Sequence, residues 1–363
     1  MRDPDNKLLE YSINKKGGWK MLNHTKNIFI TVLFVLIVSV IFPVIGSEGA
    51  ELPKALSIGT HPKGSSFNAI GSGIAKVISL HTPMTAVDRP FAGYSKWLPL
   101  LNEGGVDLGI VGNVDSYHAY HGLTPFKEPN RNLRMLTSGN DVVLSYIVRS
   151  DSPIKTYADF RNKRVVIDPT GAGTGGIQKV LISAAGLDLN KDIKAIPVAG
   201  VTEAVDALID GRADAAWASV GMGKVKEAIQ KVKGIYWVPV CSSPDDEAGK
   251  IIRKELEAQG VVLKYFKPGV LSTLDNSAWL ITYPVNLATH KGLNEEAAYL
   301  IVKAISNNQN ELSPIHPMLK GWVKKMVSKN IVFPYHPGAV RFYKEVGAWS
   351  NEMEQLQQKL SNR

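Results

Sequence analysis

The chain has 363 residues, of which 44% are hydrophobic and 21% charged, and its formal net charge is +9. This length is enough for about two domains with substantial cores. The positive charge is moderate and includes no long basic run, so it can attract anionic ligands but does not indicate a nucleic-acid-binding protein. Cys241 is the only cysteine in the sequence, which excludes an intramolecular disulfide.

The N-terminal segment has the layout of an export signal. A nearly continuous apolar run begins at Ile28, Lys26 precedes it, and small residues follow it at positions 46–50. This order predicts a secretory signal peptide that is removed, and the alternative is an N-terminal membrane anchor that is retained. In both cases we expect a periplasmic or otherwise extracytoplasmic protein. Either Met1 or Met21 can be the start of translation.

An internal repeat organises the rest of the chain. The segment from Ala92 to Ile110 aligns without a gap with the segment from Ala199 to Trp217. The identical positions are Ala92, Gly93, Leu101, Gly104 and Asp107, which match Ala199, Gly200, Leu208, Gly211 and Asp214. Each copy is typical of a βαβαβ unit, and we infer a duplication. Two such units facing each other would form a cleft at the carboxyl ends of their strands.

Hydrophobic periodicity predicts the elements in chain order. In the first copy we expect strands at residues 55–60, 84–87 and 106–111 and a helix over residues 67–80. In the second copy we expect strands at residues 164–167 and 194–198 and a helix that ends at Ala185. Outside the copies we expect a strand at residues 235–240 and helices at residues 157–160, 245–259, 295–306 and from Val340.

Two further segments predict where the chain crosses between lobes. Residues 133–148 contain two short strand-like runs on either side of a polar Ser-Gly-Asn-Asp sequence, and Ala278–Thr282 is a short apolar strand. We therefore predict an α/β protein with two lobes, a hinge and a central ligand cleft. Lobe 1 would comprise residues 51–139 and 278–363, and lobe 2 would comprise residues 140–277, after an export segment at residues 1–50.

A glycine-rich loop opens the first helix of the second copy. Residues 171–176 satisfy the G-x-G-x-x-G pattern of dinucleotide-binding proteins. That function also requires an acidic residue after the next strand, where this chain has Ala199 and Gly200. A helix N-terminus with free N–H groups binds other anions too, carboxylates included. We expect this role for the loop, and the alternative is a purely structural turn.

Several other residues admit two interpretations. Asp115, His118 and His121 could share a helical face as zinc ligands do, but a solvated polar face is the interpretation we adopt, so we predict no metal site. Arg89 could hold a carboxylate or simply be exposed. Trp217, like Trp97, could pack in the core or stack on a ligand. No nucleophile pattern such as G-x-S-x-G is present, so we expect no enzyme activity.

The chain resembles the TAXI-type solute receptors of tripartite ATP-independent periplasmic (TRAP) transporters between about Leu56 and Gly347. The most specific matches are residues 100–109, residues 171–174, and His336-Pro337-Gly338-Ala339 with Tyr343, Glu345 and Gly347. The resemblance implies the type II periplasmic binding protein fold, a ligand such as glutamate or 2-oxoglutarate, and membrane permease subunits as partners. The chain departs from the family pattern at Tyr94, Trp97 and Ala172.

We therefore expect a monomeric receptor, without a cofactor and without nucleic acid as a partner, that captures a small organic anion by hinge closure. The loops at residues 64–67 and 171–174 would donate N–H groups to the ligand, and the loops at residues 92–95 and 199–202 would form walls. The alternatives are an exported enzyme on the same fold and a ligand-sensing module. The expected ligand-binding residues are Thr60, Gly64, Ser65, Ser66, Phe67, Arg89, Ala92, Gly93, Tyr94, Ser95, Asn113, Thr170, Gly171, Ala172, Gly173, Thr174 and Trp217.

Overall fold

The computed structural model describes residues 51–363 apart from residues 64, 169–172, 199, 324–326 and 363. The predicted export segment lies outside the described residues, so it stays a prediction. Within the described part of the chain, no helix combines the length and the apolar character needed to cross a membrane.

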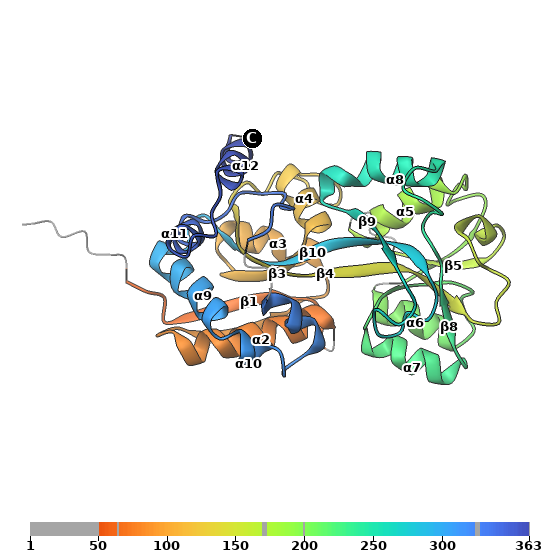
Figure 1. Cartoon of the computed structure of the whole chain (residues 1–363), viewed down its shortest axis with the longest axis horizontal. Helices are drawn as coiled ribbons and strands as arrows, with labels where there is room; N and C mark the ends of the chain where they lie inside the picture. The colour runs from red at the N-terminus through yellow and green to blue at the C-terminus, as the bar shows by residue number, and fades with distance from the viewer. Residues whose placement is uncertain (1–50, 64, 169–172, 199, 324–326, 363) are drawn as a thin grey trace, which may run out of the picture. The chain divides into compact units, whose positions relative to one another are not determined.

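From β1 to α8 the described elements alternate between strands and helices, as expected for an α/β protein, and the elements after β10 are helical (Figure 1). The strands are β1 (Ala55–Thr60), β2 (Thr85–Pro90), β3 (Leu108–Gly112), β4 (Leu133–Arg149), β5 (Arg164–Ile167), β6 (Lys194–Pro197), β7 (Ala216–Ser219), β8 (Ile235–Trp237), β9 (Val262–Phe266) and β10 (Ala278–His290). The α-helices are α2 (Ser66–His81), α3 (Tyr94–Glu103), α4 (Asn113–His121), α5 (Thr174–Ala184), α6 (Val201–Ile209), α7 (Gly223–Lys231), α8 (Glu247–Leu256), α9 (Glu295–Asn307), α10 (Gln309–Leu312), α11 (Pro337–Glu345) and α12 (Asn351–Ser361). The 3₁₀-helices are η1 (Tyr157–Phe160), η2 (Glu257–Gln259) and η3 (Pro317–Val323).

The main sheet has the strand order β2-β1-β3-β10-β4-β7, with β9 paired to β10 and β8 paired to β4. Strand β1 runs parallel to β2 and β3, whereas β10 runs antiparallel to both β3 and β4. Helix α2 packs on β1 and β2 and buries the predicted apolar stripe of Ile70, Ile74, Val77 and Ile78. We call β1–β3, α2–α4 and the helices from α9 onward the first lobe.

The second lobe comprises β5–β8 and α5–α8. Strands β5 and β6 pair in parallel, and an isolated bridge joins Val165 to Ala215 just before β7. Helix α6 packs on β7, and α5 packs on α8. The residues that α6 buries, Val205 and Leu208 among them, belong to a core cluster that also includes Trp237.

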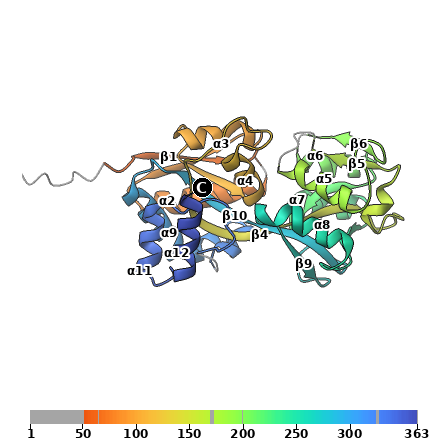
Figure 2. The same cartoon turned by 90° about the horizontal axis from the view of Figure 1, so that it is seen from above.

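Strands β4 and β10 run side by side between the two lobes (Figure 2). The prediction of two short strands at residues 133–148 is wrong, because β4 is continuous over 17 residues. Its polar centre stays extended because Ser138 pairs with Asn286 and Asp141 pairs with Pro284 of β10. Strand β10 is also longer than predicted, at 13 residues. The register shifts between Pro284 and Asn286 and again between Leu287 and Ala288, and at each shift β4 contains one residue more than β10. Both irregularities are therefore bulges of β4. The predicted lobe boundaries stay a prediction.

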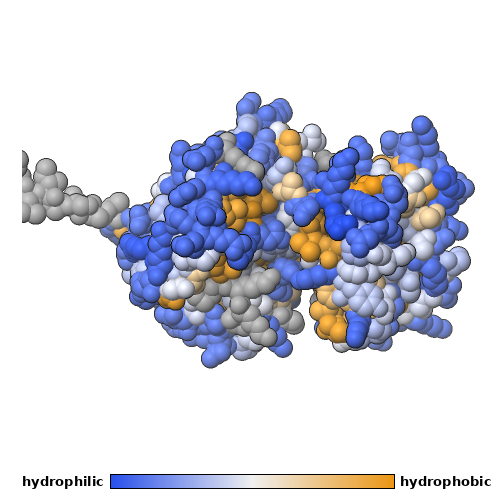
Figure 3. Space-filling view, turned by 45° about the horizontal axis from the view of Figure 1, so that its top comes forward, coloured by the Kyte–Doolittle hydropathy of each residue, from blue (hydrophilic) through white to orange (hydrophobic). Residues whose placement is uncertain are grey.

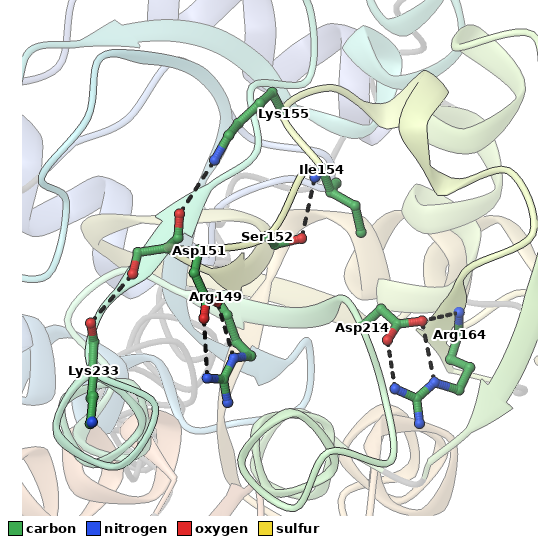
Figure 4. A network of polar contacts seen from close by, with 9 residues as sticks. Arg149, Asp151, Ser152, Ile154, Lys155, Arg164, Asp214 and Lys233 are labelled. Atoms are coloured by element: carbon green, nitrogen blue, oxygen red, sulfur yellow. Dashed lines mark hydrogen bonds and ion pairs between the residues drawn. The ribbon is translucent and has the colours of Figure 1, made fainter.

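The predicted repeat is confirmed at the level of individual contacts. The Ser57 N–H donates to Asp107 Oδ2 at 2.8 Å, and at the matching positions the Arg164 N–H donates to Asp214 Oδ2 at 2.8 Å. In the second copy the Arg164 side chain adds an ion pair to the same Asp214 carboxylate (Figure 4). The bridge from Val165 to Ala215 repeats the pairing of Ile58 with Leu108.

The two Ala-Gly loops also correspond in conformation. Gly93 precedes α3 with φ 178° and ψ 166°, and Gly200 precedes α6 with φ −177° and ψ 170°. Both backbones are extended, so these glycines are not required for conformational freedom. The two copies therefore share strand, loop and helix positions, and they lie in different lobes.

Candidate ligand-binding site

A cavity of about 510 Å³ lies between the loops of the two lobes, and the surface is indented between the lobes (Figure 3). This volume is in the range that holds a small molecule. Its lining consists of His61, Pro62, Lys63, Ser65, Ala92, Gly93, Tyr94, Ser95, Asp115, Pro125, Phe126, Asp168, Thr174, Gly200, Val201, Thr202 and Glu203. Among the described residues, the cavity thus receives side chains from both copies of the repeat.

Four helices begin at this cavity, since α2, α3, α5 and α6 start within or beside its lining. A helix N-terminus carries a partial positive charge and N–H groups that lack partners within the helix. In α2 the Ser65 side chain accepts a hydrogen bond from the Asn68 N–H at 3.1 Å. No side-chain cap is present at the start of α3, α5 or α6. The helix ends therefore provide a polar, weakly positive background.

An aromatic cluster forms the wall on the first lobe. The His61 ring stacks on Phe67 with centroids 4.8 Å apart and meets Tyr94 edge-on at 4.3 Å. Burial lowers the pKa of His61 to about 4, so this ring is neutral at pH 7. Tyr94 Oη accepts a hydrogen bond from the Gly112 N–H at 3.3 Å, which orients the phenol towards the interior.

Asp115 brings a carboxyl group from the start of α4 against the second lobe. Its side chain is buried, and a Cβ atom on Gly173 would overlap its carboxylate. Gly173 has φ +50°, in the region that favours glycine. Burial, and then the negative charge of Asp168, raise the pKa of Asp115 to about 8. Asp115 is therefore protonated in most molecules at pH 7, and it links the two lobes.

This position corrects one expectation. Asp115 does not lie on a solvated helical face, because α4 starts directly from the buried strand β3 and the Asp115 side chain is buried at the cavity. The start of α5, where we expect an anionic ligand, lies next to the carboxyl group of Asp115. The N-terminus of α5 is therefore next to a carboxyl group of the protein itself.

The expected ligand-binding residues divide into three groups. Those that line the cavity are Ser65, Ala92, Gly93, Tyr94, Ser95 and Thr174. Those that fall outside the described residues are Gly64, Thr170, Gly171 and Ala172. The remaining candidates are described but are not part of the lining of this cavity: Thr60, Ser66, Phe67, Arg89, Asn113, Gly173 and Trp217.

Three of the remaining candidates support the site from behind or lie away from it. Thr60 is buried and donates to the carbonyl oxygen of His61 at 3.1 Å. Asn113 donates from Nδ2 to the Asn330 carbonyl at 2.9 Å, which ties α4 to the C-terminal region. Arg89 is exposed, with its guanidinium 5.0 Å from the Phe91 ring centre. Among the described contacts, none brings Arg89 to the cavity.

Both tryptophans are core residues. Trp97 is buried, and the absence of side chains at Gly59 and Gly109 leaves the space that its ring fills. Trp217 is 1% exposed and packs edge-on against Tyr146 at 5.2 Å. Trp217 also lines a small annex of about 20 Å³ together with Asp168, Thr174 and Gln178. Asp168, Thr174, Gly200 and Val201 line both spaces, so the annex adjoins the main cavity.

The two histidines of α4 have structural contacts. His118 Nδ1 lies 2.8 Å from the Thr124 carbonyl, and its Nε2 lies 3.2 Å from Gln259 Oε1. The His121 ring lies 4.4 Å from that of Tyr117. In the described part of the chain, no group of three His, Cys, Asp or Glu side chains could hold a metal ion.

Sequence reasoning missed His61, Lys63, Asp115, Phe126, Asp168 and Glu203 as lining residues. The repeat itself contained a signal for two of them, because His61 and Asp168 occupy matching positions directly after β1 and β5. Glu203 directly follows the loop that we expected to form a wall. No comparable signal identified Asp115 or Phe126, which come from the segment between β3 and β4 that the repeat does not include.

Comparison with known proteins agrees with this architecture. The periplasmic binding protein BugD superposes with a TM-score of 0.52 at 13% sequence identity, covering 86% of this chain and 97% of that one. MatC from Rhodopseudomonas palustris, solved with bound malate, gives a TM-score of 0.50 at 14% identity, covering 84% and 98%. At these identities the likeness concerns the fold, which is that of periplasmic binding proteins. Residues 58–347 match the model of the NMT1-like family, and the chain belongs to that family.

Proposed function

We propose that this protein is an extracytoplasmic solute receptor that captures a small organic acid or amino acid and delivers it to the permease subunits of a TRAP transporter. The observation that carries this proposal is the cavity of about 510 Å³ walled by matching loops of two lobes. The two lobes are connected by the paired strands β4 and β10, on which they can close around a solute. Export by the N-terminal segment and a monomeric state belong to the same proposal.

The carboxylate of the ligand would bind on the first lobe. Lys63 reaches the cavity from the loop that precedes α2, and the first turn of this helix supplies N–H groups beside it. An ammonium side chain and a helix N-terminus both favour an anion, and together they form a site that the second lobe does not repeat. Ser95 and Thr202 add hydroxyl groups from the matching loops.

An exported enzyme on the same fold is the second candidate, and one observation favours it. Asp115 has a pKa raised to about 8 and faces a second carboxylate, Asp168. A buried acid with a raised pKa beside a second carboxylate also occurs in acid–base catalysis. A receptor returns its ligand unchanged, so incubation of the protein with each ligand followed by mass spectrometry separates the two functions.

The test begins with the protein collected from the extracytoplasmic fraction of the producing cell. A panel of organic acids and amino acids is screened for compounds that raise the melting temperature, and each hit is titrated calorimetrically. For a hit, we expect Lys63→Gln to weaken binding about 10-fold, in line with ~1.4 kcal/mol for a lost charged contact. Lys96→Gln removes the same charge from an exposed position of α3 and should leave the affinity unchanged. A panel without any hit, or equal losses in both variants, would contradict the proposal.

A further inference from the structure

Building on the proposed receptor function, we infer that the ligand carries a protonated amine, which Asp115 and Asp168 hold between the two lobes. The ligand class is therefore narrower than small organic acids in general. It comprises molecules with an ammonium group at the end that enters the second lobe.

The charges around the cavity support this assignment. Asp115, Asp168 and Glu203 contribute three carboxyl groups to the lining. Among the described lining residues, Lys63 is the one side chain that is positively charged at pH 7, because burial keeps His61 neutral. A dicarboxylate would have to place its second anionic group near these acids. An ammonium group in the same place would be attracted by them.

The position of Asp115 shows where the ammonium group would bind. Asp115 lies in the first turn of α4 in the first lobe and contacts Gly173 in the second, while Asp168 follows β5 in the second lobe. Two carboxylates at close range repel each other when both are ionised, and burial strengthens that repulsion. An ammonium group donates up to three hydrogen bonds and can satisfy both carboxylates at once. Each lobe then contributes one acid to the same bound group.

A second observation points independently to a bound group at this end of the cavity. Trp217 is 1% exposed, and its indole Nε1 has no hydrogen-bond partner among the described residues. It lies in the wall of the annex, which Asp168 also lines. A buried donor without an acceptor is costly, and about 20 Å³ is room for one water molecule. We expect a water in the annex to accept from Trp217 and to extend the polar contacts beside Asp168.

The rest of the lining fits such a ligand. Tyr94 and Phe126 add aromatic surface to the lining, and aromatic rings also favour nearby cations. Two kinds of compound share the required ammonium group: amino acids, whose carboxylate would reach Lys63, and amines without a carboxylate. The experiment distinguishes these two sources.

The experiment compares compounds that differ in an amino group. Glutamate is paired with glutarate, and lysine is paired with 6-aminohexanoate and hexanoate. Cadaverine, which is lysine without its carboxylate, tests an amine that carries no acid group. We expect binding by at least one amine-bearing compound and at least 10-fold weaker binding by its deaminated counterpart. Binding by cadaverine would identify an organic cation, and binding by amino acids alone would identify a zwitterion. Equal affinity for the deaminated acids would overturn this inference and leave the receptor function intact, whereas no binding at all would contradict the receptor function.

Variants assign the effect to the two acids. Asp115→Asn and Asp168→Asn keep the shape of the side chains and should each weaken amine binding at least 10-fold. Glu255→Gln removes a carboxylate from an exposed position on α8 and serves as the control, with no expected change. Circular dichroism checks that each variant is folded. If both Asn variants fold and bind amines as tightly as the parent protein, the inference is wrong.

Proton release gives a readout that a purely structural role would not affect. The groups that face Asp115 are Asp168, Tyr94 from α3 and Tyr283 from β10, and both tyrosines stay protonated because burial raises their pKa values. Below about pH 8 Asp115 is protonated without ligand, so binding of an ammonium group should release a proton. We therefore expect amine affinity to rise from pH 6 to pH 8 and the binding heat to depend on the buffer. Both effects should disappear in Asp115→Asn, and their persistence there would contradict the inference.

Discussion

The two copies of the repeat have the same backbone but present different chemistry to the cavity. After the first strand of each copy stands His61 in one and Asp168 in the other. At the helix that follows the second strand, Tyr94 corresponds to Val201. The first copy thus supplies an aromatic wall with a nearby lysine, and the second supplies an acidic and apolar wall. A duplicated scaffold can therefore keep its backbone while its loops diverge to present different side chains to one cavity.

The residues that are identical in the two copies explain why both copies keep the same backbone structure. Asp107 and Asp214 each accept a hydrogen bond from the backbone of the first strand in their copy. Gly104 and Gly211 both have positive φ, at 80° and 70°, where the chain turns after the second helix. A side chain at these turns would be strained. The shared residues thus stabilise the ends of the unit, whereas the residues that differ line the cavity.

Substitutions at Gly173 and at its counterpart Ser66 should give the largest difference in ligand affinity between the two copies. Gly173→Ala should weaken binding of the identified ligand about 10- to 100-fold, because the new Cβ overlaps the Asp115 carboxylate and the residue has φ +50°. Ser66→Ala, at the start of α2, should change the affinity less than about 3-fold. Calorimetric titration measures both.

The outcome also bears on closure of the lobes. Small-angle X-ray scattering with saturating ligand should show a larger radius of gyration for Gly173→Ala than for the parent protein, because a Cβ atom at residue 173 would overlap the Asp115 carboxylate and hold the lobes apart. A Gly173→Ala protein that closes and binds like the parent would show that this contact does not limit closure.

Substitution of the aspartates shared by the two copies should have a smaller effect, which is a loss of stability of equal size in both copies. Asp107→Ala and Asp214→Ala should each lower the free energy of unfolding by about 1–2 kcal/mol, because each leaves a strand N–H without its partner. The Arg164 ion pair is partly exposed and should add little. Chemical denaturation measures both values. A loss confined to one aspartate would argue against equivalent roles.

The ion pair between Arg164 and Asp214 predicts that the stability of the protein depends on pH. The hydrogen bond from Arg164 holds the pKa of Asp214 below its usual value of 3.8. The stability that this carboxylate contributes is therefore present above pH 4 and is lost as the pH falls through its lowered pKa. Consequently, the stability difference between the parent protein and Asp214→Asn should be full at pH 6 and should shrink below about pH 4.

The smallest effect is expected at Arg89, whose counterpart in the second copy is Ile196. Arg89 is exposed, reaches the Gly105 carbonyl at 3.4 Å and lies over Phe91. Arg89→Ala should therefore change ligand affinity less than about 2-fold, since surface substitutions rarely exceed ~0.5 kcal/mol. A 10-fold loss in calorimetric titration would mean that the binding site extends to the end of β2.

Much of the fold could be predicted because its signals are local. Strand β1 and helix α2 lie at the predicted positions, since alternation and a helical apolar stripe identify them directly. Strand β4 could not be predicted in full, because its Ser-Gly-Asn-Asp centre is typical of a turn. That centre is extended only because β10, far along the chain, pairs with it. Tertiary pairing therefore overrode local preference at the crossing.

The site was predictable where the repeat extends and unpredictable beyond it. The loops at Gly93 and Gly200 were expected in the walls, and both line the cavity. Asp115 was assigned to a solvated face because its spacing from His118 suggests a polar helix surface. Its burial depends on the opposite lobe, which meets it through Gly173. Such a contact between distant segments leaves no pattern in the local sequence.

The pairing of strands β4 and β10 determines in which direction the connection between the lobes bends most easily. Both covalent crossings lie next to each other in one sheet, so they form a flat strip. A strip of this kind bends across its plane more easily than it shears or stretches along it. Its compliance is concentrated where the register slips near Pro284, because bulges bend a strand locally. Bending of such a strip has essentially one direction, so closure of the proposed receptor would bring Asp115 to the same place beside Gly173 each time.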